Sequence, residues 1–111
     1  RLSPTKKAAT AYVTEQLGDG KPALAAIDYV RAVALSVGSW VPGGLTVLGT
    51  DGYGQSDNRA ALRDHFEVDA RHITVAALHR LAQDDVVDAK KVQQAIKTYE
   101  IDPGKIFPAD V

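Results

Sequence analysis

Apolar residues near the start of the chain recur at helical spacing. Ala9, Tyr12, Val13 and Leu17 follow one side of a helix, and Gly18 comes directly after them. Glycine commonly ends helices because it adopts left-handed backbone angles without steric cost. The pattern therefore predicts a first amphipathic helix that ends at Gly18.

Two short apolar runs flank a second helical pattern. Residues 23–27, ALAAI, form an unbroken apolar run, which is typical of strands buried on both faces, and residues 45–48, LTVL, are predicted to be a second strand. Asp28 is a candidate N-cap for the helix between them, and Pro42 would end it. The inner face of this helix is formed by Val30, Val33, Ala34, Val37 and Val41.

The order strand, helix, strand over residues 23–48 has the length of a right-handed crossover between two parallel strands. The segment that follows, LGTDGYGQSD at residues 48–57, would then leave the carboxyl end of a parallel strand. Open α/β sheets usually bind their ligands at that edge. The loop is therefore the first place to look for a site.

The second half of the chain is predicted to be helical. Leu62 and Phe66 lie one turn apart, and Asp69 and Asp88 are candidate N-caps for two further helices. The helix after Asp69 is apolar over a broad arc and is expected to be well buried. Its apolar residues are Ile73, Ala76, Ala77, Leu78 and Leu81, and those of the last helix are Val92, Ala95, Ile96 and Tyr99.

The count of elements is uneven, with two strands against about five helices. A two-stranded parallel sheet is not a stable architecture by itself, so strands are expected to be missing from it. The proline and glycine clusters have the length of turns within one unit and not of linkers. Residues 1–111 are therefore predicted to form a single, incomplete α/β unit.

Composition narrows the class of protein. A chain of 111 residues that is 45% hydrophobic suffices for one modest domain, and 13 basic against 14 acidic side chains give a net charge of -1. This balance argues against partners recognised by charge, namely nucleic acid and anionic membranes. The chain has no cysteine, which excludes disulfides and thiolate chemistry and suits a reducing compartment.

No apolar segment approaches the roughly 20 residues that a membrane-spanning helix needs. The opening residues, RLSPTKK, lead into no signal-peptide core. We therefore expect a soluble, cytoplasmic protein. The chain contains no methionine, even at position 1, which indicates a processed product or a fragment.

The glycine-rich loop has two interpretations. Gly49, Gly52 and Gly54 could cradle a phosphate, but their spacing does not match GxGxxG and no Walker lysine follows. Alternatively, the glycines let the backbone turn tightly from a strand into a helix capped by Ser56 or Asp57. The second interpretation is favoured.

Three histidines, His65, His72 and His79, are seven residues apart and would align if one helix carried them all. Asp69, as a cap, argues that a helix begins between the first and the second. Metal ligation also needs nearby carboxylate or cysteine ligands, so histidines at the surface or partly packed are favoured over zinc ligands.

Other candidate chemistry finds little support. Asp51 and Asp57 could form an acid/base pair, but nothing in their positions implies a perturbed pKa. The chain contains no GxSxG or HExxH motif of a hydrolase. Trp40 and Tyr53 could anchor a partner, although aromatic residues at such places more often belong to a core or an intramolecular interface.

A longer segment resembles a known family. Residues 48–82, LGTDGYGQSDNRAALRDHFEVDARHITVAALHRLA, are similar to the last domain of the transketolase superfamily, and GTDGYGxSDxRxxLRxHFEVD is the form found in the homodimeric bacterial pyruvate dehydrogenases. These are the thiamine-dependent first components of the pyruvate dehydrogenase complex. The similarity extends over residues 10–103, through PALAAIDYVRAVALSVGSWVP and DAKKVQQAIKTYEID.

The resemblance implies a three-layer α/β/α domain with a mixed, mostly parallel sheet, of which this chain is the later part. Enzymes of the family have two further domains that bind thiamine diphosphate and Mg²⁺ between subunits. The family's catalytic and cofactor-binding residues lie in those domains. The resemblance therefore assigns no catalytic, cofactor-binding or metal-binding residue to this chain, and the chain alone is expected to be inactive.

The resemblance also implies a reaction and partners for the parent enzyme. The reaction is the decarboxylation of pyruvate on thiamine diphosphate, followed by reductive acetylation of the lipoyl group of the dihydrolipoyl acetyltransferase component. The expected partners are that component, the remaining domains and the second subunit of the homodimer. The chain would be a structural and assembly domain, with a regulatory small-molecule module as the alternative.

The resemblance makes the loop a structural turn that faces a neighbouring domain or subunit. Six residues give this segment its identity and are the candidates for interface or ligand contact. They are Asp51, Tyr53, Ser56, Arg59, Arg63 and His65.

Overall fold

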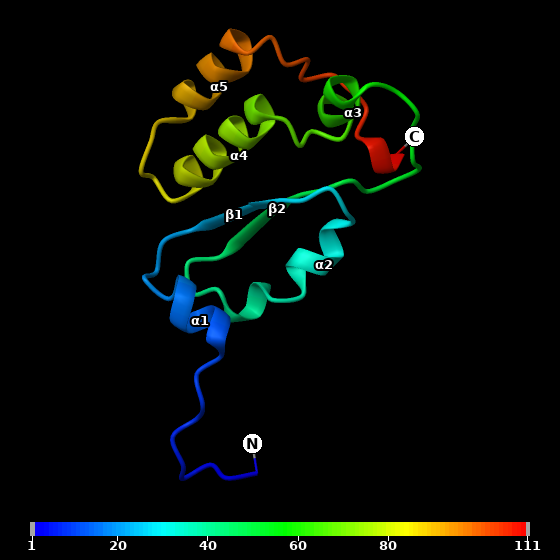
Figure 1. Ribbon diagram of the computed structural model, residues 1–111. Helices are drawn as coiled ribbons and strands as arrows, with labels where there is room; N and C mark the ends of the chain where they lie inside the picture. Colours follow the sequence, from blue (N-terminus) through cyan, green and yellow to red (C-terminus); the bar gives the residue numbers. More distant parts are fainter. Residues whose placement is uncertain (1, 111) are drawn as a thin grey trace.

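A computed structural model describes residues 2–110 and contains five α-helices and two β-strands in that range (Figure 1). The prediction of two strands and about five helices is confirmed. In chain order the elements are α1 (Tyr12–Leu17), β1 (Ala23–Ala26), α2 (Arg31–Leu35), β2 (Leu45–Leu48), α3 (Arg59–His65), α4 (Ala70–Gln83) and α5 (Ala89–Thr98), with 3₁₀ turns η1 (Gly38–Trp40) and η2 (Pro108–Asp110).

The two strands pair in parallel, as the strand, helix, strand pattern predicts. Ala23 lies opposite Leu45 and Ala26 opposite Leu48, so the strands are in register over their full length. Helix α2 contacts β2, whereas α4 contacts both strands, and Figure 1 shows these helices on opposite sides of the sheet. The sheet is thus the middle layer of an α/β/α arrangement, in which α5 packs against α4.

Side-chain caps explain where two of the helices begin. The carboxylates of Asp69 and Asp88 accept hydrogen bonds from the backbone amides of His72 and Lys90, which confirms both predicted caps. For α3 the prediction of Ser56 or Asp57 is wrong, because the side chain of Asn58 accepts from the Ala61 amide. The chain turns for one residue more before the helix begins.

The predicted cap of α2 is also wrong. Asp28 does not cap this helix, because the N-cap position falls on Val30, which has no side-chain hydrogen bond. The helix also ends at Leu35, earlier than predicted, and η1 replaces its last turn. Ser36, Val37 and Gly38 all have low helix propensity, which accounts for the early end.

The first helix begins at Tyr12, three residues later than the apolar pattern indicates. Its N-cap is Ala11, whose side chain cannot accept a hydrogen bond from the free amides of the first turn. The hydroxyl of Thr14 donates to the carbonyl of Trp40, which fastens α1 to η1. Residues 2–10 lead away from the rest of the molecule as an exposed tail (Figure 1).

The core is small. The buried apolar residues among those described are Val41, Val47, Phe66 and Val92, and none of the larger side chains is fully enclosed. Strand β1 and helix α4 are mostly half-buried, contrary to the prediction that both are well buried. Two strands present too little surface to cover either element, so their apolar residues stay partly in contact with water.

The molecule is correspondingly open. Its radius of gyration is 16.9 Å, whereas a compact chain of this length has a radius of about 13 Å. Its accessible surface is 8150 Å², against about 5,900 Å² for a compact monomer of the same mass. Among residues 2–110 there is no helix with the length and apolar character required to cross a membrane.

Candidate functional site

The loop after β2 lies at the carboxyl end of the parallel sheet, as predicted. Its first turn is attached to the segment after β1, because the Thr50 amide donates to the Tyr29 carbonyl over 2.9 Å. Gly49 faces the same carbonyl so closely that a Cβ placed on it would lie 2.6 Å from the oxygen. The backbone of these two segments therefore meets without room for a side chain.

Asp51 fixes the next part of the loop. One carboxylate oxygen accepts from the Arg31 amide over 2.8 Å and the other from Arg31 Nε over 2.6 Å. Asp51 thereby satisfies the first free amide of α2, the task that sequence analysis gave to Asp28. Two hydrogen bonds from Arg31 lower the pKa of the Asp51 carboxyl. The larger effect comes from the backbone amide of Arg31 and the smaller from its guanidinium.

The end of the chain closes over the same region. The guanidinium of Arg31 lies 5.0 Å from the ring centre of Phe107, in a cation–π arrangement. Gly52 has a φ of +94°, and a Cβ on it would lie 2.5 Å from the Pro108 carbonyl oxygen. The C-terminal turn η2 thus rests against the loop, with Pro108 buried.

These contacts support the structural interpretation of the loop at Gly49 and Gly52. The free sides of Gly49 and Gly52 face protein backbone and not an open space, so these glycines serve the close approach of chain segments. A diphosphate group would need their amides and the space beside them. The described residues of this loop therefore do not fit thiamine diphosphate.

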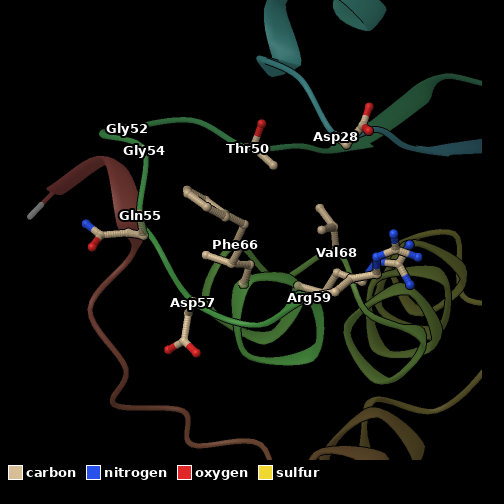
Figure 2. A pocket seen from close by; sticks show the side chains of 11 residues that line it. Asp28, Thr50, Gly52, Gly54, Gln55, Asp57, Arg59, Phe66 and Val68 are labelled. Carbon is tan, nitrogen blue, oxygen red and sulfur yellow. The ribbon is translucent and has the colours of Figure 1, made fainter.

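A cavity of about 710 Å³ opens between the loop and α3 (Figure 2). Phe66 and Val68 point into this space, whereas Asp57 points away from it. Asp28 borders it from the end of β1. The remaining lining residues are Thr50, Gly52, Gly54, Gln55, Arg59, Leu62 and Arg63.

The six residues singled out from the sequence do not form one site. Arg59 and Arg63 line the cavity together, whereas Asp51 is turned toward Arg31. Tyr53 is 81% exposed and Ser56 is exposed, and neither lines the cavity. His65 ends α3 and packs edge-on against Phe66, with ring centres 4.7 Å apart.

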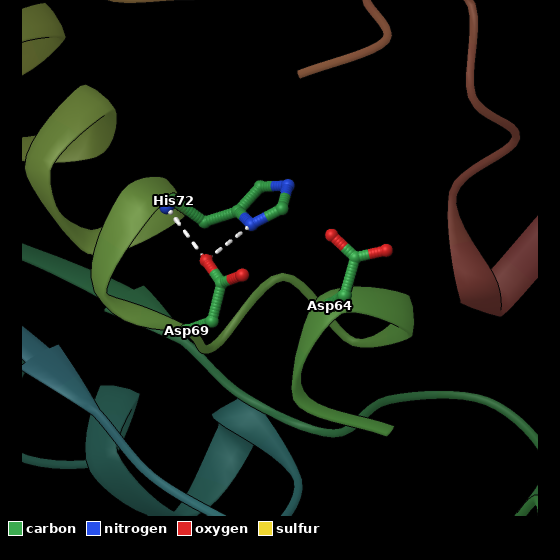
Figure 3. Close-up of side chains that lie close together, drawn as sticks. All are labelled: Asp64, Asp69 and His72. Carbon is green, nitrogen blue, oxygen red and sulfur yellow. Dashed lines mark hydrogen bonds and ion pairs between the residues drawn. The ribbon is translucent and has the colours of Figure 1, made fainter. Parts of the chain in front are cut away.

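A second polar cluster joins α3 to α4 (Figure 3). Asp64, Asp69 and His72 each place a carboxylate oxygen or ring nitrogen within 4.8 Å of the others. His65 and His79 take no part in it, and α3 and α4 are separate helices, as the position of Asp69 predicted. The three side chains have the donor chemistry of a cation site.

The guanidinium of Arg71 already pairs with both carboxylates of this cluster. Arg71 donates to Asp64 and, over 2.7 and 2.9 Å, to Asp69. The second oxygen of Asp69 accepts from the backbone amide and the Nδ1 of His72, at 3.0 and 2.7 Å. Both carboxylates are therefore committed to protein donors, and the cluster acts as a fastener between two helices.

The cluster perturbs one acid strongly. Burial raises the pKa of Asp69, but the hydrogen bonds from His72 and Arg71 outweigh it and lower this pKa to about 2. His72 is buried, and its Nε2 has no hydrogen-bond partner among the described residues. Because the Asp69 carboxylate is ionised and can only accept, Nδ1 is the ring nitrogen that donates to it.

Neither candidate acid/base group has the geometry of a catalyst. Asp51 is held ionised by Arg31, and a carboxylate with a lowered pKa is a weak general base at neutral pH. Asp57 accepts a hydrogen bond over 2.7 Å from the Asn58 amide and points away from the cavity. Both carboxylates accept hydrogen bonds from backbone amides, Asp51 from that of Arg31 and Asp57 from that of Asn58.

Sequence reasoning missed the partners of these aspartates. Arg31 lies 20 residues before Asp51, and a carboxylate in a glycine loop gives no sign of the helix start that it caps. Arg71 follows the cap Asp69 by two residues, a spacing that allows the hydrogen bond between them. The hydrogen bond from Arg71 to Asp64 depends on how α3 packs against α4, which the sequence does not indicate. No feature of the sequence indicated that Phe107 would contact Arg31.

Comparison with known proteins gives consistent relatives. The chain is 43% identical over 111 residues to the pyruvate dehydrogenase E1 component of Cupriavidus necator, which covers 99% of the chain and 12% of the relative. It is 44% identical to the E1 component of Pseudomonas aeruginosa, in an alignment that covers 99% of the chain and 13% of the relative. It is 43% identical to that of Escherichia coli, in an alignment that covers 96% of the chain and 12% of the relative. No protein-family model matches the chain.

Proposed function

We propose that this chain, homologous along nearly all of its length to one segment of the pyruvate dehydrogenase E1 component, is a non-catalytic structural and assembly domain of such an enzyme. The chain spans about 12% of the length of these relatives. The parent enzyme would decarboxylate pyruvate on thiamine diphosphate and acetylate the lipoyl group of the acetyltransferase component.

One observation carries the proposal, an apolar surface on α2 and η1 that faces water. We call it the α2 face, and its exposed fractions run from 40% for Val37 to 63% for Tyr29. Several large apolar residues that are exposed within one short segment usually mark an interface. The α2 face consists of Tyr29, Val30, Val33, Leu35, Val37 and Trp40.

The open shape supports the same conclusion. The accessible surface exceeds that of a compact monomer by about 2,200 Å², to which the N-terminal tail and the α2 face both contribute. Obligate interfaces bury about 2,000 Å² or more in total. Burial of the α2 face against the remaining domains or the second subunit of a homodimer would complete the small core.

We expect the cofactors to bind in other parts of the parent enzyme. The glycine loop meets protein backbone, and the Asp64–Asp69–His72 cluster already holds the Arg71 guanidinium. Thiamine diphosphate and Mg²⁺ would therefore be bound outside this segment, where they supply the carbanion chemistry of decarboxylation. The chain contributes no group to that step and is inactive alone.

A chimera tests the proposal. In the E1 component of Escherichia coli, the matched segment of 108 residues is replaced by this chain, with and without Val33→Asp and Leu35→Asp. A charge on the α2 face would be buried unpaired on assembly. We expect sedimentation to show loss of assembled enzyme and activity to fall by the same factor.

The control is Lys90→Asp and Lys97→Asp, which introduces two aspartates at exposed positions on α5. This variant should assemble and react like the chimera without substitutions. Full assembly and activity in the α2 face variant would contradict the proposal.

A second candidate function is a regulatory small-molecule module of the same enzyme. The cavity beside the loop favours it, because it lies at the carboxyl ends of the strands, where open α/β sheets bind ligands. A metabolite that raises the melting temperature of the chain in proportion to the logarithm of its concentration would support this function.

A further inference from the structure

One face of α3 lines the cavity. Arg59, Leu62, Arg63 and Phe66 all border it, and residues at i, i+3, i+4 and i+7 share one side of a helix. Phe66 is buried and Leu62 half-buried, whereas both arginines are exposed. The face therefore presents two guanidinium groups beside an apolar floor.

The pairing of arginines sets these two apart. Within residues 2–110, Arg31, Arg71 and Arg80 each form an ion pair with at least one aspartate. Arg59 and Arg63 form none with the described residues, although like charges one turn apart on a helix repel each other. An anion held between them would remove that repulsion.

The acidic residues that border the cavity do not act as the anion between Arg59 and Arg63. Asp57 points away from it and accepts from the Asn58 amide. Asp28 lies at the end of β1, on the side opposite α3 (Figure 2). Among the described residues, neither Asp28 nor Asp57 lies close enough to Arg59 or Arg63 to form an ion pair.

The wall opposite α3 is held in position before any ligand arrives. Thr50 is bonded to Tyr29, and Gly52 is pressed against Pro108 by the C-terminal turn. A site whose walls are already fixed loses less conformational freedom on binding. Gly54, further along the loop, also lines the cavity, and a Cβ placed on it would meet no atom within 4 Å.

We propose that this cavity binds a small organic oxyanion, a carboxylate or a phosphate ester. Arg59 and Arg63 hold its charged group, and its carbon skeleton rests on Leu62, Phe66 and Val68. Arginine suits this task because its planar fork donates two parallel hydrogen bonds to either oxyanion. The proposal rests on the second candidate function and names its ligand class.

Thermal shift and ¹H–¹⁵N NMR titrations of the chain test it with three probes: phenyl phosphate, benzoate and inorganic phosphate. We expect phenyl phosphate or benzoate to raise the melting temperature linearly with the logarithm of concentration and to shift the amides of residues 50–68. The stronger of the two identifies the oxyanion. Inorganic phosphate should bind at least tenfold more weakly, because it makes no contact with the apolar floor.

Variants locate the site. Arg59→Ala with Arg63→Ala should weaken binding at least tenfold, whereas Lys90→Ala with Lys97→Ala, which removes two cations from α5, should leave it unchanged. Arg59→Lys with Arg63→Lys keeps the charge and the helix propensity. It should weaken binding at least threefold and serves if the alanine variant fails to fold.

Equal responses of the original chain and both arginine variants would overturn the proposal, as would equal affinity for inorganic phosphate and the organic probes. Absence of binding by all three probes would overturn it too. The chimera experiment does not involve this cavity. If the α2 face variant loses assembly as expected, the assembly function stands even when the oxyanion proposal is overturned.

Discussion

Asp51 shows how one side chain can serve two segments of the chain. It belongs to a loop that resembles a ligand-binding turn, yet both of its oxygens bond to Arg31. The hydrogen bond from the Arg31 amide caps α2, a helix whose own N-cap residue, Val30, has a side chain that cannot accept a hydrogen bond. The conformation of the loop and the start of α2 therefore depend on the same carboxylate.

Replacement of Asp51 by alanine should destabilise the chain by about 1–2 kcal/mol, the usual cost of losing a helix cap. Asp51→Asn is the matched control, because an amide oxygen can still accept from the Arg31 amide. Urea unfolding followed by circular dichroism gives both values. A loss below about 0.3 kcal/mol for the alanine variant would show that α2 does not need this cap.

Asp69 makes stability depend on pH. Its pKa of about 2 in the folded chain lies below about 3.9, the value for an unfolded aspartate, so the unfolded chain binds this proton more strongly. The contribution is complete above pH 4 and is lost as the pH falls from about 4 through about 2. Unfolding free energies measured across this range should show the decline.

Asp69→Asn isolates this effect, because asparagine can cap α4 but cannot titrate. Its stability should change less between pH 4 and 2 than that of the original chain. Parallel curves for the two proteins would assign the acid sensitivity to other carboxylates.

The helices and strands were predictable where a local signal specifies them. The caps Asp69 and Asp88 are close in sequence to the amides that they bind, and LTVL has the length and composition of a strand. Asn58 was missed because Ser56, Asp57 and Asn58 are all good caps, and only the path of the loop selects among them. The contacts of Asp51 and Arg71 join separate elements, so sequence spacing could not reveal them.

The contact between the loop and the C-terminal turn can be broken at one glycine. Gly52→Ala would place a methyl group 2.5 Å from the Pro108 carbonyl oxygen at a φ of +94°, so the turn must move away. We expect a loss of about 1–3 kcal/mol from this strain. Differential scanning calorimetry measures it.

Gly54→Ala is the matched control in the same loop, because a methyl group there would meet no atom within 4 Å. Its effect should stay within about 0.5 kcal/mol. Equal effects of the two substitutions would mean that η2 does not rest on the loop in solution.

At the scale of the whole molecule, the sheet and the core are both incomplete. Two parallel strands leave an unpaired edge on either side within the described residues, and four apolar residues are buried. Such edges and the exposed α2 face tend to recruit other chains. The sequence predicted the shortage of strands, but the prediction that Val30, Val33 and Val37 lie on the inner face of this helix is wrong, because all three are exposed. An apolar stripe has the same sequence whether it is covered or not.

The isolated chain should therefore self-associate. We expect light scattering to give an average mass above 11.8 kDa that rises with concentration. Val33→Asp with Leu35→Asp should lower this mass toward that of the monomer. A clean monomer of the unsubstituted chain at high concentration would argue against the exposed edges and face as association surfaces.

Hydrogen exchange followed by mass spectrometry tests the central claim most directly, by comparing peptides over residues 29–40 in the isolated chain and in the chimera. We expect the α2 face to be exposed in the monomer and covered in the assembled enzyme. At a concentration where the isolated chain is monomeric, exchange there should therefore be at least tenfold faster than in the chimera. Peptides from α5 serve as the internal reference. Equal exchange of the α2 face in both proteins would contradict the claim that this chain is an assembly domain.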